Sequence, residues 1–237
     1  MEGDKSRTGP WTTLKAVVFD LDDTLVLSTV DFGKFRALVI DRMVELGEDR
    51  GSYDLSETIV RILDRYERRM RGRGLVEEEV RRRLAELDGI MDRVELEKVD
   101  ETGAIEGARE LLAFLRGKGV RVGILTRGCA RYAESALTVT GLADLVDAVE
   151  SRNSHTRPKP HPDSYMRLVE ALGVAKEHTL FVGNHGIDAG CAAEAGVPFV
   201  GVMTGDVPER ALRDAGAVKV VEDLGELRGW LASVLGD

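Results

Sequence analysis

Two kinds of hydrophobic pattern alternate along the second half of the chain. Short runs rich in apolar and β-branched residues predict buried strands, and apolar residues at three- and four-residue spacing predict amphipathic helices. The predicted strands cover residues 15–20, 120–126, 146–150, 178–183, 198–203 and 218–221, and the predicted helices cover 106–117, 129–140, 162–172, 187–195, 208–215 and 223–235. Strands and helices that alternate at these lengths form parallel βαβ units. The pattern therefore predicts an α/β fold with a Rossmann-like, doubly wound parallel sheet.

Residues 30–100 show a different hydrophobic pattern. Three segments carry apolar residues at helical spacing between charges, and no strand pattern interrupts them: residues 31–47, 55–71 and 75–98. Such segments are typical of amphipathic helices. We therefore predict a core made of residues 1–26 and 103–237, with an α-helical domain inserted at residues 27–102.

The composition is that of a folded protein. Of 237 residues, 43% are hydrophobic and 32% are charged, which provides enough apolar material for a core and argues against intrinsic disorder. No run approaches the ~20 apolar residues needed to cross a bilayer. The polar residues 1–14 are predicted to be a loose tail and lack the apolar stretch of a signal peptide. We therefore expect a cytoplasmic protein with no membrane partner.

Charge and cysteine content exclude further classes. The chain has 33 basic and 42 acidic residues and a net charge of −9, which argues against a nucleic-acid partner. Its two cysteines, Cys129 and Cys191, cannot form a disulfide scaffold, and no Cys/His spacing indicates a zinc site. The candidate chemistry must therefore come from other residues.

Parallel sheets of this kind bind ligands beyond the carboxyl ends of their strands. The first strand ends at Asp20, and Asp22 follows two residues later. Two carboxylates this close in apolar surroundings repel each other, and a divalent cation or a shared proton would relieve the repulsion. Helix capping is the alternative interpretation of Asp22.

Two more strand-end or loop positions carry candidate chemistry. Thr126 ends a strand, and a hydroxyl followed by backbone amides at a helix start can bind an anion. Arg127, beside it, could bind a substrate anion or point to solvent. Lys159 lies between Pro158 and Pro160, which stiffen the backbone and suit the lysine to direct its charge at one point.

A further strand ends at Gly183 and Asn184, with Asp188 four residues later at a predicted helix start. Asp188 could simply complement the helix dipole. Asn184 and Asp188 could instead both face a metal ion.

Together, and in this order, these positions resemble the motifs of the haloacid dehalogenase superfamily of phosphotransferases, in its phosphoglycolate phosphatase-like branch. The DxDxT motif is matched by Asp20, Asp22 and Thr24, the second motif by Thr126, the third by Lys159, and the GDxxxD motif by residues 183–188. The resemblance covers residues 15 to about 203. It implies that residues 27–102 form an α-helical cap domain of the kind that closes over small soluble substrates.

The resemblance implies an enzyme, a magnesium-dependent phosphatase. Asp20 would attack phosphorus and form an aspartyl-phosphate, and Asp22 would act as general acid and then as general base. Thr126 and Lys159, with Arg127 as a further candidate, would bind the oxygens of the transferring phosphate. Because halide leaves without a proton, an acid at position 22 favours phosphate chemistry over dehalogenation.

The implied Mg²⁺ site comprises Asp20, the backbone carbonyl of Asp22, Asn184 and Asp188. Asn184 departs from the family, which usually has Asp at this position. An amide can ligate magnesium but brings no charge, so we expect an active enzyme with a raised magnesium requirement. The competing interpretation is a catalytically weakened protein that binds a phosphorylated ligand.

The expected partner is a small phosphorylated metabolite. By similarity to its branch of the family, the substrate would be a phosphomonoester such as phosphoglycolate or a sugar phosphate. A phosphomutase is the alternative enzyme, although no cap signature for it is present. The amphipathic helices of the cap could also supply a homodimer surface.

Overall fold

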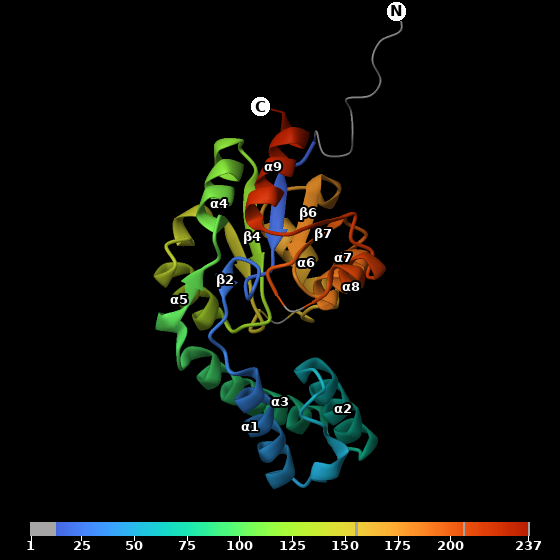
Figure 1. The fold of residues 1–237 in the computed structure, drawn as a ribbon. Helices are drawn as coiled ribbons and strands as arrows, with labels where there is room; N and C mark the ends of the chain where they lie inside the picture. Colours follow the sequence, from blue (N-terminus) through green and yellow to red (C-terminus); the bar gives the residue numbers. More distant parts are fainter. Residues whose placement is uncertain (1–12, 155, 206, 237) are drawn as a thin grey trace, which may run out of the picture. The chain divides into compact units, whose positions relative to one another are not determined.

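The computed structural model describes residues 13–154, 156–205 and 207–236 (Figure 1). Residues 1–12 of the predicted N-terminal tail lie outside the described residues. The strands are β1 (Ala16–Phe19), β2 (Val26–Leu27), β3 (Gly103–Ala104), β4 (Arg121–Leu125), β5 (Ala148–Glu150), β6 (Thr179–Gly183), β7 (Phe199–Val202) and β8 (Lys219–Val221). The α-helices are α1 (Phe32–Glu45), α2 (Ile59–Gly72), α3 (Glu77–Leu96), α4 (Ala108–Gly117), α5 (Ala130–Val139), α6 (Asp163–Ala171), α7 (Gly186–Ala195), α8 (Glu209–Asp214) and α9 (Leu224–Leu235). Among the described residues, none of these helices is both long enough and apolar enough to span a membrane.

Six strands form a sheet in the order β5-β4-β1-β6-β7-β8, and every neighbouring pair is parallel. The central strand β1 is buried along its whole length. Its Val18 lies opposite Gly123 of β4 on one side and Phe181 of β6 on the other. The predicted doubly wound α/β fold is confirmed.

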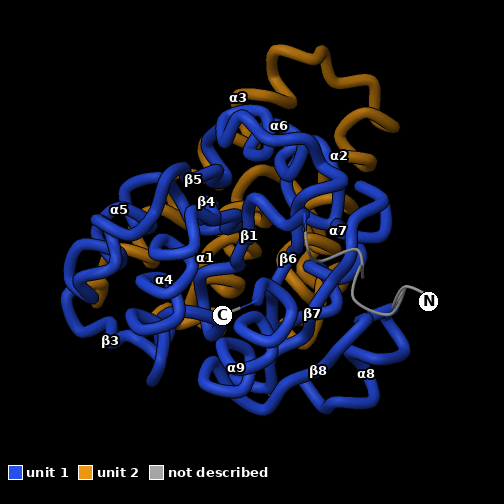
Figure 2. The backbone as a smooth tube through the Cα atoms, turned by 90° about the horizontal axis from the view of Figure 1, so that it is seen from above, with its two compact units in different colours: residues 1–28, 100–237 blue, residues 29–99 orange. Residues whose placement is uncertain are grey.

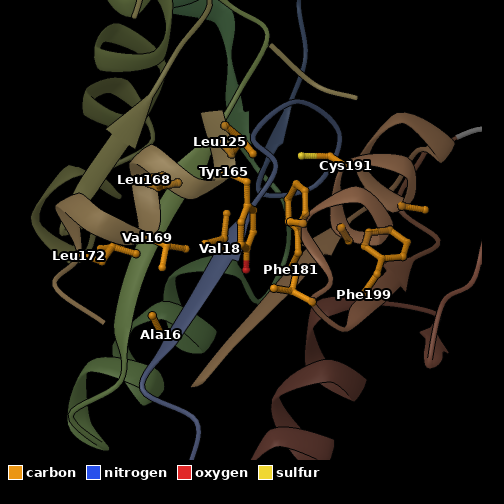
Figure 3. Packing of buried hydrophobic residues seen from close by; sticks show 14 of the residues in the cluster. Ala16, Val18, Leu125, Tyr165, Leu168, Val169, Leu172, Phe181, Cys191 and Phe199 are labelled. Atoms are coloured by element: carbon orange, nitrogen blue, oxygen red, sulfur yellow. The ribbon is translucent and has the colours of Figure 1, made fainter. Parts of the chain in front are cut away.

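Helices cover both faces of this sheet. On one face, α6, α7 and α8 pack on the strands over a core of buried apolar side chains (Figure 3). The ring of Tyr165 in α6 is tilted against that of Phe181 in β6, with centroids 5.3 Å apart, and the Phe181 centroid lies 6.1 Å from that of Phe199 in β7. Val18 joins this core. Because side chains alternate along a strand, Val17 points to the opposite face, which α4 and α9 cover (Figure 1).

The strand order places a topological switch at β1. From β1 the chain passes to β4 and β5 on one side, and it then returns to β6 on the other side. The carboxyl end of β1 therefore lies between the carboxyl ends of β4 and β6. In open α/β sheets this is the position at which ligands bind.

The structure also contains a short antiparallel pair, β2 with β3, that the sequence did not predict. Val26 pairs with Ala104, and Leu27 pairs with Gly103. Strands of two residues are too short to show the alternation from which strands are predicted. This pair joins the two chain segments that flank the helical insertion.

The described residues divide into two compact units, one up to Ser28 and from Asp100 onward, the other covering residues 29–99 (Figure 2). The second unit contains α1, α2 and α3, one in each predicted amphipathic segment, and α3 packs against both other helices. Its core includes Phe35, Val39, Met43, Ile62, Tyr66, Met70, Leu87 and Met91. The assignment of residues 27–102 as a cap stays a prediction.

One buried carboxylate lies inside the helical unit. Glu48 is 5% exposed and accepts a hydrogen bond from the Tyr53 hydroxyl at 2.8 Å. Its two oxygens also form ion pairs, one with Arg69 Nε at 3.0 Å and the other with an Arg73 guanidinium nitrogen at 2.6 Å. Buried charges occur in proteins when they are paired in this way.

Candidate active site

Asp20 is fixed directly beyond the carboxyl end of β1. Its backbone N–H donates to the carbonyl of Val182 at 2.9 Å, which continues the pairing between β1 and β6. One carboxylate oxygen, Oδ2, accepts from Thr24 Oγ1 at 3.2 Å, and the other, Oδ1, accepts from Lys159 Nζ at 2.5 Å. The first and third motifs predicted from the sequence therefore meet.

A tight turn follows Asp20 and carries Asp22. The N–H of Leu25 donates to the carbonyl of Leu21 at 2.9 Å, so the chain reverses within a few residues. Asp23 adopts a left-handed conformation with φ 54°, which Asp tolerates better than most residues. Its side chain accepts from the Ser28 N–H at 3.1 Å. This turn holds Asp22 half-buried at the same end of the sheet.

Lys159 connects two carboxylates. Its side chain is 3% exposed, and Nζ lies 2.5 Å from Asp20 Oδ1 and 2.7 Å from Asp188 Oδ1. The ammonium also lies 5.7 Å from the centroid of the Phe181 ring, within the range of a cation–π interaction. The loop between Pro158 and Pro160 thus brings the Lys159 ammonium to both carboxylates.

The buried charges of this cluster do not balance. Burial raises the pKa of Asp20 to about 7, Lys159 opposes the shift, and the carboxylates of Asp188 and Asp22 add to it. Burial disfavours the Lys159 ammonium, but Asp188 and Asp20 outweigh that effect and raise the pKa of Lys159 above its usual value. The lysine stays charged, and the site retains an excess of negative charge that a cation would relieve.

Asp188 both caps a helix and faces the site, so the two interpretations left open by the sequence are compatible. Its Oδ2 accepts from the His185 N–H at 3.1 Å, while His185 Nδ1 accepts from the Ile187 N–H at 3.1 Å. These two bonds close the first turn of α7. The other oxygen of Asp188 is thereby left to contact Lys159.

Thr126 stands at the carboxyl end of β4 and is 2% exposed. Its hydroxyl accepts from the Gly128 N–H at 2.9 Å and lies 3.5 Å from Asp22 Oδ2. The second motif therefore joins the first at the same end of the sheet. The structure thus brings Asp20, Asp22, Thr126 and Lys159 together, as the sequence predicts.

Tyr132 also belongs to this site, and sequence reasoning missed it. Its hydroxyl donates to Asp22 Oδ1 at 2.5 Å. The residue lies in the first turn of α5, the helix that follows Thr126, and it is fully buried. Its place in that turn, just beyond a strand end, was the available signal, but a tyrosine in an amphipathic helix is typical of a core.

Arg127 and Asn184 are the remaining site residues that the sequence predicts. The guanidinium of Arg127 donates to the backbone carbonyl of Lys159. It therefore lies against the lysine loop, the segment between β5 and α6 that carries Lys159. Asn184 is half-buried after β6, and its Nδ2 lies 2.5 Å from the position that a Cβ of Gly205 would take. Their roles in binding a substrate anion and a metal ion stay predictions.

The donor atoms at this site suit magnesium. Carboxylate oxygens of Asp20 and Asp188 both contact the Lys159 ammonium. Asp22 follows β1, as Asp20 does, and Asn184 follows β6, as Asp188 does. Magnesium prefers hard oxygen donors of this kind. The excess buried negative charge and the donor set together fit the predicted metal.

Comparison with known proteins agrees with the motifs. A model of the haloacid dehalogenase-like hydrolase family matches residues 14–196. A phosphoglycolate phosphatase from Cereibacter sphaeroides is 32% identical over 193 residues, which cover 78% of this chain and 84% of that protein. The chain belongs to the haloacid dehalogenase-like hydrolases. Within this family it falls in the phosphoglycolate phosphatase-like branch, so the resemblance found in the sequence is confirmed.

Two other matches differ in how much of the chain they cover. A phosphoglycolate phosphatase from Rhodospirillum rubrum is 34% identical over 125 residues, covering 53% of this chain and 52% of that protein. The chain therefore spans about half the length of that relative. The crystal structure of a hydrolase from Pseudomonas syringae superposes with a TM-score of 0.66 at 22% identity, over 94% of this chain and 100% of that one, and supports the fold.

Proposed function

We propose that the chain is a magnesium-dependent phosphatase that hydrolyses small phosphomonoesters through an aspartyl-phosphate on Asp20. The observation that carries the proposal is the meeting of Asp20, Asp22, Thr126 and Lys159 beyond three neighbouring strands. Membership of the family supports the same chemistry.

In the first half-reaction, a carboxylate oxygen of Asp20 attacks the phosphorus of the ester. The bond between phosphorus and the ester oxygen breaks, and that oxygen takes the proton of the Asp22 carboxyl group, so that a neutral alcohol leaves. Lys159 and Thr24 hold the Asp20 carboxylate from opposite oxygens and thereby fix its direction of attack.

In the second half-reaction, water attacks the phosphorus of the aspartyl-phosphate. The Asp22 carboxylate takes a proton from this water, the bond between phosphorus and Asp20 breaks, and inorganic phosphate leaves. Asp22 regains its proton and Asp20 its charge. The Thr126 hydroxyl and Lys159 ammonium bind phosphate oxygens throughout.

Magnesium, held by Asp20, the carbonyl of Asp22, Asn184 and Asp188, would neutralise charge on the transferring phosphate. Asn184 supplies an amide where the family usually supplies a carboxylate, so this chain binds the metal with one negative charge fewer. We infer a raised magnesium requirement rather than loss of catalysis, since Asp20 and Asp188 remain.

The substrate class follows from the relatives. The relatives from Rhodospirillum rubrum and Cereibacter sphaeroides are named phosphoglycolate phosphatases. These names support a small phosphomonoester as the substrate and make 2-phosphoglycolate the first compound to test. The helical unit of residues 29–99 is the proposed cap, which would close over such a substrate.

The test is hydrolysis of p-nitrophenyl phosphate and of 2-phosphoglycolate by the purified protein during a magnesium titration, beside Asp20→Asn. We expect magnesium-dependent phosphate release that the variant lacks. Turnover without an added sugar bisphosphate distinguishes a phosphatase from a mutase. Equal rates for the wild type and Asp20→Asn would overturn the aspartyl-phosphate on Asp20. Absence of turnover in both the wild type and Asn184→Asp at saturating magnesium would overturn the proposal in favour of a non-catalytic phosphate-binding protein.

A further inference from the structure

We propose that Tyr132 is a positioning residue that holds Asp22 in the orientation required for proton transfer. The proposal rests on the phosphatase function above, because it gives Tyr132 a role in the general acid–base step. Its phenol would fix one oxygen of Asp22 and leave the other to exchange the proton with the substrate and with water.

The contact distances favour this division of labour. Asp22 Oδ1 accepts from the Tyr132 hydroxyl at 2.5 Å, whereas Asp22 Oδ2 lies 3.5 Å from Thr126 Oγ1. A hydrogen bond of the first length holds its acceptor oxygen in place, whereas a contact of 3.5 Å is at the limit of hydrogen bonding. The bond to Tyr132 therefore holds Oδ1, and the proposal assigns the proton transfer to Oδ2, the oxygen on the side of Thr126.

The position of the phenol is built into the fold. The ring is fully buried, and the backbone N–H of Tyr132 donates to Cys129 Sγ at 3.4 Å at the start of α5. A Cβ on Gly128 would lie 2.7 Å from a ring carbon of Tyr132. A side chain at position 128 would thus push the ring away, and glycine allows the phenol to reach Asp22.

A carboxylate at the end of a turn can adopt several rotamers, and each wrong rotamer costs catalysis because proton transfer needs hydrogen-bond distance. Burial of the tyrosine means that the phenol offers Asp22 a rigid donor, with little entropy lost on forming the bond. Tyr132 touches neither the phosphorus nor the leaving group in this scheme. It acts through Asp22.

The test compares Tyr132→Phe with the wild type by kcat/KM on two substrates at saturating magnesium. Departure of the glycolate hydroxyl from 2-phosphoglycolate needs a proton, whereas p-nitrophenolate leaves without one. We expect kcat/KM to fall about tenfold to a hundredfold for 2-phosphoglycolate and less than about threefold for p-nitrophenyl phosphate. In an Asp22→Asn background, Tyr132→Phe should have no further effect.

Tyr165→Phe is the matched control. Tyr165 is equally buried and bonds Thr179 Oγ1 at 2.8 Å, away from Asp22, so its loss should affect both substrates alike. Equal losses on both substrates for Tyr132→Phe, or additive losses with Asp22→Asn, would assign Tyr132 to packing alone and overturn the proposal.

Crystal structures of the wild type and of Tyr132→Phe provide a readout that does not need turnover. We expect the Asp22 carboxylate to keep its bond to the phenol in the wild type and to leave that position in the variant. An Asp22 side chain that is unchanged in the variant would overturn the proposal, even if the chain proved to hydrolyse no phosphate ester. Absence of turnover in the wild type, or a rate that is unchanged in Asp20→Asn, would count separately against the proposed function.

Discussion

A Cβ atom on Gly183 would lie 2.5 Å from Oδ2 of Asp188, closer than Cβ atoms approach other atoms in proteins. The end of β6 and the start of α7 therefore pack so closely that the Asp188 carboxylate covers the strand end. This contact places the other oxygen of Asp188 2.7 Å from Lys159 Nζ. The glycine of the fourth motif is thus required by the position of its acid.

Replacement of Gly183 by Ala should displace Asp188 from Lys159. Because the crowded atom is part of a buried carboxylate, we expect a loss of about 1–3 kcal/mol in the free energy of unfolding and a fall in kcat. Urea unfolding and steady-state kinetics measure both. Gly186→Ala is the control, since a Cβ there meets nothing within 4 Å and alanine suits a helix. Equal behaviour of the two variants would contradict the argument.

Replacement of Lys159 by Met should leave Asp20 and Asp188 buried without their cation. Removal of one partner from a buried ion pair costs about 3–5 kcal/mol. We expect a loss of that size in urea unfolding without magnesium, and a partial recovery when magnesium is added. Lys219→Met breaks a partly exposed pair with Glu226 and should cost only about 0–1 kcal/mol. A similar small loss for Lys159→Met would show that the buried cluster is not held by charge.

Replacement of Asn184 by Asp should restore the missing charge of the proposed metal site. We expect the magnesium concentration for half-maximal rate to fall on the order of tenfold, because affinity for hard cations follows the number of charged ligands. Asn153→Asp makes the same substitution in an exposed loop and should leave the magnesium requirement unchanged. No change, or a rise, for Asn184→Asp would argue against Asn184 as a ligand.

The pKa of Asp20 predicts an acidic limb in the rate profile. Burial raises this pKa from 3.8 to about 7, and only the ionised carboxylate can attack phosphorus. At low magnesium, kcat/KM should therefore fall about tenfold per pH unit below pH ~7. Magnesium favours the ionised form, so the limb should move to lower pH as magnesium rises. A profile that is flat from about pH 5 to about pH 8 would contradict this assignment.

The raised pKa of Asp20 also makes the free energy of unfolding depend on pH. Between about pH 3.8 and about pH 7, the folded protein without metal holds a proton on Asp20 that the unfolded chain has lost. The contribution of Asp20 to the free energy of unfolding should therefore decrease as pH rises through this interval. Asp20→Asn, which cannot titrate, should remove this part of the pH dependence.

The sheet was predictable because its central strands are buried on both faces. A parallel strand between two helix layers is a nearly continuous apolar run, and Asp20 and Thr126 each interrupt such a run at its end. Since the carboxyl ends of parallel strands lie at one edge, order along the chain was sufficient to bring these two residues together. Their pairwise distances were not needed.

Contacts that depend on exact packing could not be predicted. The sequence gives no sign that Tyr132 reaches Asp22, because its helical spacing is that of any core tyrosine. The sharing of Lys159 between Asp20 and Asp188 likewise depends on how β1, the lysine loop and α7 meet. For Asp188 the sequence left capping and site chemistry open, and only the structure shows that its two oxygens do different things.

The buried carboxylate of Glu48 should contribute to the stability of the helical unit. Glu48 accepts from Tyr53, Arg69 and Arg73, and it connects the segment after α1 to α2 and to the residue that ends α2. In Glu48→Gln, the amide nitrogen would face arginine donors and the charge would be lost. Because both arginines are partly exposed and can be solvated, we expect a loss of about 1–3 kcal/mol rather than that of a fully buried pair.

Hydrogen exchange of the whole chain measures this effect where it arises. Amides of α1, α2 and α3 should exchange faster in Glu48→Gln, while those of β1, β4 and β6 should keep their wild-type rates, because the two units have separate cores. Glu45→Gln, which removes an exposed partner of Arg42, should change neither set. Faster exchange in the central strands of the sheet would instead mean that the two units unfold together.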